Sequence, residues 1–321
     1  MKYAFILLAM ILGFSADLPA QADYPSKPIT IIVPYPPGGQ GDVFARLIAE
    51  RLTTRLKQTV VVDNKPGATG ALGTRMVAKA ASDGYTLLLG QTGEIAVNQS
   101  VVKSLGYDPV KDFKPIVLIG DGPLILAVPG NSPYTSVQDL ILAARAKPGS
   151  ISYASSGTAT PGHLAAAALA LGTKTQMSHV PYKGGGQALT DLMGGHVQFF
   201  FSSASAAMAH LASGKIRALA ISSPQRQSAL PQIPTVAESG LPGFAYSLWG
   251  GLFAPIGTSD DIVAMLNREV NSVLSEALFK NRLEGDGNTV RNNSPAQFAD
   301  FVVRDIYKYA GVTKAIGIQA E

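Results

Sequence analysis

Short β-branched segments alternate with helical segments along this chain, and clusters of Gly, Pro, Ser or Thr separate them. The first pair is typical: residues 28–33 (PITIIV) predict a buried strand, and residues 42–56 predict a helix that Asp42 can cap. Strands that alternate with helices pair in parallel, and the helices cover the sheet. The pattern therefore predicts an α/β fold.

The alternation continues to the C-terminus. Further strands are predicted at residues 59–62, 85–90, 114–120, 124–128, 151–154, 178–180, 197–201, 216–221 and 249–254. Further helices are predicted to end near residues 81 and 193, and to span residues 136–146, 164–171, 259–275 and the region from 294 onward. Residues 224–242 are rich in Pro and polar residues, which is typical of a crossover between lobes. A chain of 321 residues is long enough for two such lobes.

Residues 1–22 are predicted to form a cleavable signal peptide. Lys2 precedes an apolar run at residues 4–14, and Ala20 and Ala22 supply the small side chains required for cleavage after Ala22. The alternative, a membrane anchor, is disfavoured because the apolar run is too short to span a bilayer. The chain has no Cys, which excludes a thiol nucleophile and Cys-based metal sites. We therefore expect a soluble periplasmic protein.

Charge and motifs argue against several other functions. The net charge of +4 is spread along the chain, which disfavours nucleic-acid binding and is compatible with an anionic ligand. The four histidines show no tight ligand spacing, so no metal site and no cofactor is expected. The sequence lacks GxSxG, and the SxxK match at residues 100–103 is expected by chance. We do not expect an enzyme.

The chemistry is expected in the loops that follow strands and precede helices. In an open parallel sheet these loops gather at the carboxyl edge, where helix N-termini offer free N–H groups to an anion. Residues 37–42 are either part of such a site or a tight turn, and residues 155–160 are either a ligand cradle or a capping loop. Lys183 either orients a carboxylate or is a solvated surface residue, and His163 is interpreted as structural. The loops together suit a carboxylate or phosphate held by backbone amides.

Several segments, in order along the predicted mature chain, resemble the Bug family, the extracytoplasmic receptors of tripartite tricarboxylate transporters. They are residues 34–42 (PYPPGGQGD), 64–73 (NKPGATGALG), 83–87 (DGYTL), 107–113 (YDPVKDF), 179–186 (HVPYKGGG), 230–243 (LPQIPTVAESGLPG) and 315–318 (AIGI). The resemblance covers essentially the whole mature chain and is more specific than any single Gly-rich loop.

The resemblance implies a two-lobe periplasmic-binding-protein (Venus flytrap) architecture, each lobe a mainly parallel sheet flanked by helices. Lobe 1 would comprise residues 23–124 and 231–321, and lobe 2 residues 125–230. A monomeric receptor would capture a small carboxylate, either a dicarboxylate, a tricarboxylate or an aromatic acid, in the cleft between the lobes. It would close by hinge motion and deliver its ligand to integral membrane subunits of a transporter.

The loops at residues 37–42, 155–163 and 182–186 would face the cleft. The expected ligand-binding residues are Tyr35, Pro37, Gly38, Gly39, Gln40, Asp42, Thr92, Gly93, Ser155, Ser156, Thr158, Thr160, His163, Tyr182, Lys183, Gly184, Ser202 and Ser203. Relatives often carry an acidic or amide residue where this chain has Ser202 and Ser203. Because a buried ammonium needs a charged partner, we expect a carboxylate without an amino group.

Three other functions stay open at this stage. A receptor that feeds a signalling sensor would share the same sequence features. A secreted hydrolase would need an activated nucleophile or a metal, and the sequence supplies neither. A ligand-sensing regulator would carry a helix-turn-helix and no signal peptide.

Overall fold

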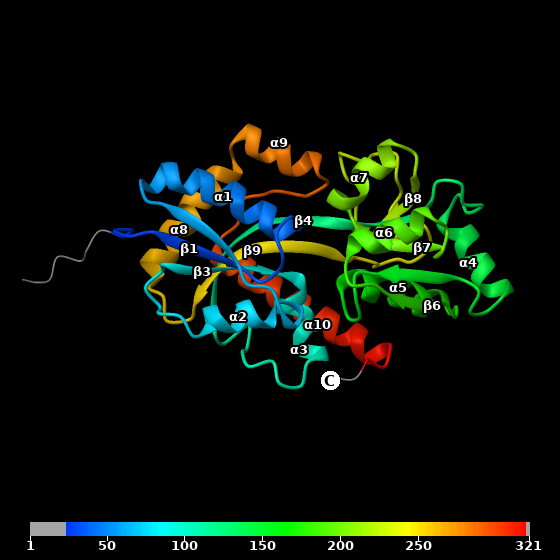
Figure 1. Ribbon diagram of the computed structural model, residues 1–321, viewed down its shortest axis with the longest axis horizontal. Helices are drawn as coiled ribbons and strands as arrows, with labels where there is room; N and C mark the ends of the chain where they lie inside the picture. The colour runs from blue at the N-terminus through cyan, green and yellow to red at the C-terminus, as the bar shows by residue number, and fades with distance from the viewer. Residues whose placement is uncertain (1–23, 319–321) are drawn as a thin grey trace, which may run out of the picture.

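The computed structural model describes residues 24–318. Figure 1 shows two α/β halves side by side, with strands β4 and β9 running between them. The predicted signal peptide lies outside the described residues. No helix in the described part of the chain is long and apolar enough to cross a membrane.

The first half is built on a sheet with the strand order β2-β1-β3-β9-β4. Its strands are β1 (Ile29–Val33), β2 (Val60–Asn64), β3 (Thr86–Gln91), β4 (Phe113–Pro129) and β9 (Ser247–Pro255). Strand β1 pairs in parallel with β2 and β3, as the alternation predicted, whereas β9 runs antiparallel to both β3 and β4. The antiparallel strands bring the C-terminal part of the chain into the middle of the first sheet.

Helices cover both faces of this sheet because its strands are apolar on both sides. One face packs against α1 and α8 through buried residues such as Phe44, Ile48 and Leu266. On the other face, α10 buries Phe298 against Trp249 of β9. The helices of this half are α1 (Gln40–Leu56), α2 (Ala71–Ala78), α3 (Asn98–Val101), α8 (Asp260–Leu274), α9 (Ala277–Gly285) and α10 (Pro295–Ala315).

The second half is built on the far end of β4, which pairs with β7 and β8. Beyond β7 the sheet continues in parallel to β5 and β6. Its strands are β5 (Ser152–Ser155), β6 (Ser178–Pro181), β7 (Phe199–Ser203) and β8 (Ile216–Ile221). Its helices are α4 (Val137–Ala146), α5 (Pro161–Thr173), α6 (Gly185–Met193) and α7 (Ala204–Ala212).

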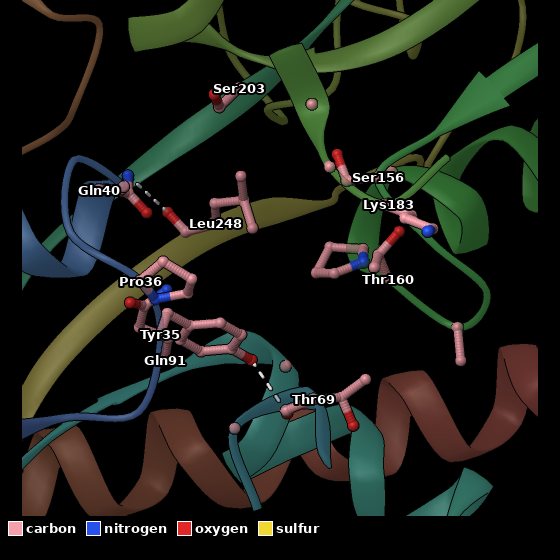
Figure 2. Close-up of a pocket in the computed structure, with 18 of the residues that line it drawn as sticks. Tyr35, Pro36, Gln40, Thr69, Gln91, Ser156, Thr160, Lys183, Ser203 and Leu248 are labelled. Carbon is pink, nitrogen blue, oxygen red and sulfur yellow. Dashed lines mark hydrogen bonds between the residues drawn. The ribbon is translucent and has the colours of Figure 1, made fainter. Parts of the chain in front are cut away.

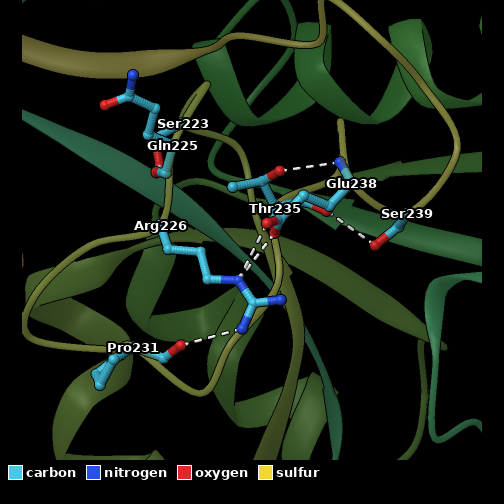
Figure 3. A network of polar contacts seen from close by, with 7 residues as sticks. All are labelled: Ser223, Gln225, Arg226, Pro231, Thr235, Glu238 and Ser239. Carbon is cyan, nitrogen blue, oxygen red and sulfur yellow. Dashed lines mark hydrogen bonds and ion pairs between the residues drawn. The ribbon is translucent and has the colours of Figure 1, made fainter.

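Residues 224–242 connect β8 to β9 and so return the chain from the second sheet to the first. Within this connection Arg226 forms an ion pair with Glu238 at 3.0 Å and donates to the carbonyl of Pro231 (Figure 3). Glu238 also accepts the N–H of Thr235. Because both side chains are about half exposed, the ion pair contributes little to stability.

The structure corrects the sequence prediction at five places. Helix α1 has Gly39 as its N-cap, and the predicted cap, Asp42, lies within its first turn. The strands predicted at residues 114–120 and 124–128 are one strand, β4, whose register against β9 shifts twice. Helices α7 and α9 were not predicted. The strand predicted at residues 85–90 extends to Gln91 as β3, and it is followed by an unpredicted π-helical turn, η2 (Gly93–Val97), that leads into α3. The antiparallel pairing of β4 and β9 was also not anticipated, because strand–helix alternation carries no signal for it.

Glycines in β9 allow the close packing at the centre of the molecule. A Cβ on Gly251 would lie 2.3 Å from Cζ of Phe298 and 2.7 Å from the carbonyl oxygen of Val117. Since real Cβ atoms do not approach other atoms this closely, only glycine lets α10 lie directly on this strand.

Candidate functional site

A cavity of about 990 Å³ lies between the two halves. The first half contributes the β1–α1 loop, the segment before α2 and the end of β3. The second half contributes the β5–α5 and β6–α6 loops and the end of β7. In Figure 2, Tyr35 and Gln40 face Thr160 and Lys183 across the cavity, with Leu248 between them.

Five helices begin at this cavity, and none has a side chain that caps its N-terminus. Their N-cap residues, all of which line the cavity, are Gly39 (α1), Gly70 (α2), Thr160 (α5), Gly184 (α6) and Ser203 (α7). Elsewhere Ser136, Ser259 and Ser294 each cap a helix through the hydroxyl group. The first N–H groups of a helix have no partner within the helix and carry a partial positive charge. In α2 the N–H groups of Ala71 and Leu72 already donate to the carbonyls of Ala68 and Gly67. The cavity therefore offers free amides mainly from α1 in the first half and from α5, α6 and α7 in the second.

Asp42 shapes the β1–α1 loop. Its carboxylate accepts hydrogen bonds from the N–H of Gly38, from Nε of Arg46 and from Nδ2 of Asn64, each at 3.0 Å. Nδ2 of Asn64 also donates to the carbonyl of Tyr35 at 3.1 Å. Burial works against ionisation, but the bonds from Arg46, Gly38 and Asn64 hold the pKa of Asp42 below its usual value. The carboxylate of Asp42 is thus ionised and engaged in hydrogen bonds that hold the loop.

The segment before α2 is strained where it lines the cavity. Residues 67–70 all have positive φ, and two of them, Ala68 (48°) and Thr69 (50°), are not glycine. Two hydrogen bonds hold the carbonyl of Thr69, from Nδ2 of Asn98 at 3.0 Å and from the Tyr35 hydroxyl at 3.2 Å. Non-glycine residues in this region cost about 1–3 kcal/mol each and concentrate at binding sites.

Two stacked histidines hold the β5–α5 loop in place through hydrogen bonds. The rings of His163 and His179 lie 3.8 Å apart, and Nδ1 of His163 accepts the N–H of Ala159 at 3.0 Å. Nε2 of His179 lies 2.7 Å from Oγ of Ser155, whose oxygen also accepts the N–H of Gly157. Burial, followed by the neighbouring His179, lowers the pKa of His163 to about 4, and burial lowers the pKa of His179. Both rings are neutral at pH 7.

The structure brings most of the predicted site residues to the cavity wall. Thirteen of them line it: Tyr35, Pro37, Gly39, Gln40, Asp42, Gly93, Ser156, Thr158, Thr160, Lys183, Gly184, Ser202 and Ser203. The other predicted residues, Gly38, Thr92, Ser155, His163 and Tyr182, are not part of the lining.

These five residues are instead placed where they hold the lining in position. Gly38 donates to Asp42, and Ser155 and His163 fix the β5–α5 loop. The hydroxyl of Thr92 accepts the N–H of Trp249 at 2.9 Å, which ties the end of β3 to β9. The hydroxyl of Tyr182 donates to Asp191 of α6 at 2.7 Å. In this conformation their polar atoms are engaged by the protein, and their role as direct ligand contacts stays a prediction.

Sequence reasoning missed other lining residues. Among them are Pro36, Thr69, Gln91, Asn98, Val101, Phe200 and Leu248. Thr69 had a signal, because it lies in a quoted Gly-rich segment before a helix. Asn98 and Leu248 had none, because only the tertiary structure brings α3 and β9 to the cavity.

Charge is sparse in the cavity. Asp42 and Lys183 are the charged residues in the described lining, and Lys183 is exposed and forms no ion pair within the described part of the chain. The described residues contain no cluster of His, Cys, Asp or Glu that could hold a metal ion. Apolar side chains such as Leu124, Phe200 and Leu248 complete the wall. The site can hold a small anion with an apolar body.

Two α/β halves with a cavity between them form the architecture of periplasmic solute-binding proteins. The sequence profile of the family described as "Tripartite tricarboxylate transporter family receptor" matches residues 44–318. The chain belongs to this family, whose members are solute-binding receptors rather than enzymes. The resemblance to the Bug family is thereby confirmed.

Individual relatives support this assignment. Protein BugT of Bordetella pertussis is 38% identical over 317 residues, which cover 97% of both chains. An R. palustris protein solved with adipate superposes with a TM-score of 0.86 at 36% identity, covering 93% of this chain and all of the other. MatC from Rhodopseudomonas palustris, solved with bound malate, has a TM-score of 0.80 at 32% identity and covers 90% of this chain and 99% of its own.

Proposed function

We propose that this receptor binds a small dicarboxylate without an amino group in the cavity between its halves. The observation that carries the proposal is the convergence of the N-termini of α1, α5, α6 and α7, which lack side-chain caps, on one cavity from both sides. Amides on both sides suit a ligand with a carboxylate at each end, and the apolar wall suits the carbon chain between them. The relatives solved with adipate and with malate each hold a dicarboxylate.

The absence of an amino group from the ligand follows from the acids available. Asp42 is the acidic residue of the described lining, and its carboxylate is already engaged by Arg46, Gly38 and Asn64. Ser202 and Ser203, at the end of β7, carry no charge. An ammonium in this cavity would lose its hydration without gaining an ionic partner.

We further propose the biological setting of this binding. The protein is exported to the periplasm after cleavage behind Ala22, and it delivers its ligand to integral membrane subunits of a tripartite transporter. Lobe 1 comprises residues 23–124 and 231–321, and lobe 2 residues 125–230. The family assignment and the passage of β4 from one sheet to the other support this division.

Calorimetric titration tests the ligand class. Adipate, succinate and L-malate are titrated into the purified protein beside L-aspartate, which is succinate with an added amino group. We expect at least one dicarboxylate to bind with one site per chain, and succinate to bind more tightly than L-aspartate. Tighter binding of L-aspartate would contradict the exclusion of an amino group, and the absence of binding by every carboxylate would contradict the proposal as a whole.

A further inference from the structure

Glu94 is a buried carboxyl directly behind the cavity wall. It follows Gly93, a lining residue, in the π-helical turn η2, and its side chain is completely buried. Its Oε1 accepts the N–H of Gln91, another lining residue, at 2.5 Å. Its Oε2 is also buried and has no hydrogen-bond partner in the described part of the protein. Buried polar atoms are nearly always paired, so this carboxyl needs an explanation.

Tyr35 lies beside this carboxyl in the cavity wall. A Cβ placed on Gly70 would lie 3.0 Å from the Tyr35 hydroxyl and 3.1 Å from Cβ of Glu94, so the phenol and the acid flank the same point. A Cβ on Gly93 would lie 2.5 Å from the same hydroxyl. Tyr35 donates to the carbonyl of Thr69, which also lines the cavity. Glu94 therefore lies next to three segments of the cavity wall: the β1–α1 loop, the segment before α2 and the turn η2.

Among residues 24–318, no cation forms an ion pair with Glu94. The titratable groups facing it are Tyr35 from the β1–α1 loop and Tyr107, whose hydroxyl donates to the Glu94 carbonyl at 2.6 Å. Helix α10 also packs on η2, but its Asp305 and Lys308 pair with each other. Burial raises the pKa of Glu94 to about 8, and the hydrogen bond from the N–H of Gln91 opposes this only in part. The carboxyl is neutral at pH 7.

Ionisation of Glu94 would affect the cavity in two ways. It would place a negative charge behind a wall whose free amides favour an anion, and that charge would repel a ligand carboxylate through a medium of low dielectric constant. It would also change the hydrogen bonding around Tyr35. Both effects oppose ligand binding.

We propose that Glu94 is a positioning residue that must be neutral for the cavity to hold a carboxylate, so that ligand affinity falls when this side chain ionises. The inference rests on the proposed function. By linkage, ligand binding must then favour the neutral form and draw a proton from solution at alkaline pH.

The test compares adipate binding by calorimetry at pH 7 and pH 9 for the native protein and for Glu94→Gln. Adipate is fully ionised at both pH values, so its own charge does not change. If only the neutral form binds, the native protein should lose about tenfold in affinity at pH 9. Glu94→Gln keeps the shape and neutrality of the acid and should lose little. Glu50→Gln, which changes an exposed glutamate on α1, is the matched control and should behave as the native protein.

Titration of the native protein in buffers with different ionisation enthalpies gives a second measurement that needs no variant. We expect uptake of a proton on binding at pH 8 to 9 and none at pH 6. Equal affinity at both pH values, a tenfold loss that persists in Glu94→Gln, or the absence of proton uptake at pH 8 to 9 would each overturn the inference and leave the proposed function standing. A protein that binds no carboxylate at pH 7 would overturn the proposed function itself.

Discussion

Gly39 is the residue at which the β1–α1 loop becomes helix, and its surroundings separate steric from electrostatic effects. A Cβ added at this position would meet only the carbonyl oxygen of Pro36, at 4.0 Å, so a side chain fits. Its φ of −78° is also open to any residue. The glycine therefore matters because it leaves the first amides of α1 free, rather than because a larger residue would clash.

Replacing Gly39 with Asp should abolish carboxylate binding while preserving the fold. Aspartate is a good N-cap, so its carboxylate would take the amides that the ligand needs and would repel the ligand as well. Thermal unfolding should show stability equal to or slightly above that of the native protein, and calorimetry should show at least a hundredfold loss of affinity. Gly39→Ala is the matched control and should bind nearly normally. Unchanged affinity in Gly39→Asp would remove this loop from the site.

The buried histidine pair predicts an acid-sensitive stability. Because the pKa of His163 is about 4 in the folded protein and about 6.5 when unfolded, the unfolded chain binds more protons between these values. The free energy of unfolding should therefore fall as pH decreases from 6.5 toward 4, by about 3 kcal/mol at most from this residue. Denaturant titrations at several pH values measure this slope.

His163→Gln should reduce that slope, whereas His196→Gln, at an exposed histidine, should not. An identical pH dependence in the native protein and in His163→Gln would show that another group is responsible.

At the scale of elements, the presence or absence of a side-chain cap distinguishes most helix N-termini. Those at the cavity lack a side-chain cap, whereas α4, α8 and α10 are capped by serine and α9, away from the cavity, is uncapped. In α10, Ser294 accepts the N–H of Gln297, whose side chain accepts the N–H of Ser294 in return. The caps away from the cavity stabilise their helices, and their absence at the cavity leaves amides for a ligand.

Ser294→Ala should therefore affect stability alone. Loss of an N-cap costs about 1 kcal/mol, which a denaturant titration resolves. Ligand affinity measured on the same sample should remain within about twofold of the native value, since α10 begins away from the cavity wall. A large loss of affinity would mean that the start of α10 is coupled to the site.

Most elements could be predicted from the sequence because their patterns are local. Neighbouring residues are enough to predict the strand at residues 28–33, the Gly-rich loop that follows it and the helix capped by Ser294. Strand β4 could not be predicted as one element, because Gly120, Gly122 and Pro123 are typical of a turn and become a strand only by pairing with β9. Helix α7 was missed because it follows β7 without any loop.

The site was predictable to the extent that loops define it. The strand-to-helix loops were located correctly, but which atoms face the cavity depends on packing. Ser155 and His163 were expected to contact ligand, yet their polar atoms are used to hold the loop. No sequence pattern predicted a role for Glu94, because that role depends on its burial beside Tyr35, and burial is set by the tertiary structure.

At the scale of the whole molecule, the cavity is assembled from two halves that share few connections. Strand β4 pairs with β9 in the first half and with β7 and β8 in the second, and the β8–β9 connection returns the chain. Register shifts in β4 interrupt regular pairing before the strand leaves the first sheet. This arrangement suits hinge motion, which needs only a few residues to change conformation.

Small-angle scattering should show that the protein becomes more compact when saturated with a bound dicarboxylate. The reason is that a ligand held by amides from both halves is bound most tightly when the halves approach each other. The Gly39→Asp variant should show no compaction at the same ligand concentration. An unchanged radius of gyration in the native protein would indicate a site that does not close.

The most direct test of the central claim is a thermal-shift screen of residues 23–321 against aliphatic di- and tricarboxylates, acidic amino acids and aromatic acids, with sugars and phosphates as controls. A ligand present at 100 times its dissociation constant should add about 2.7 kcal/mol of stability, enough for a clear rise in the unfolding temperature. The account predicts stabilisation by a carboxylate without an amino group and none by sugars or phosphates. Stabilisation by sugars or phosphates alone would contradict it.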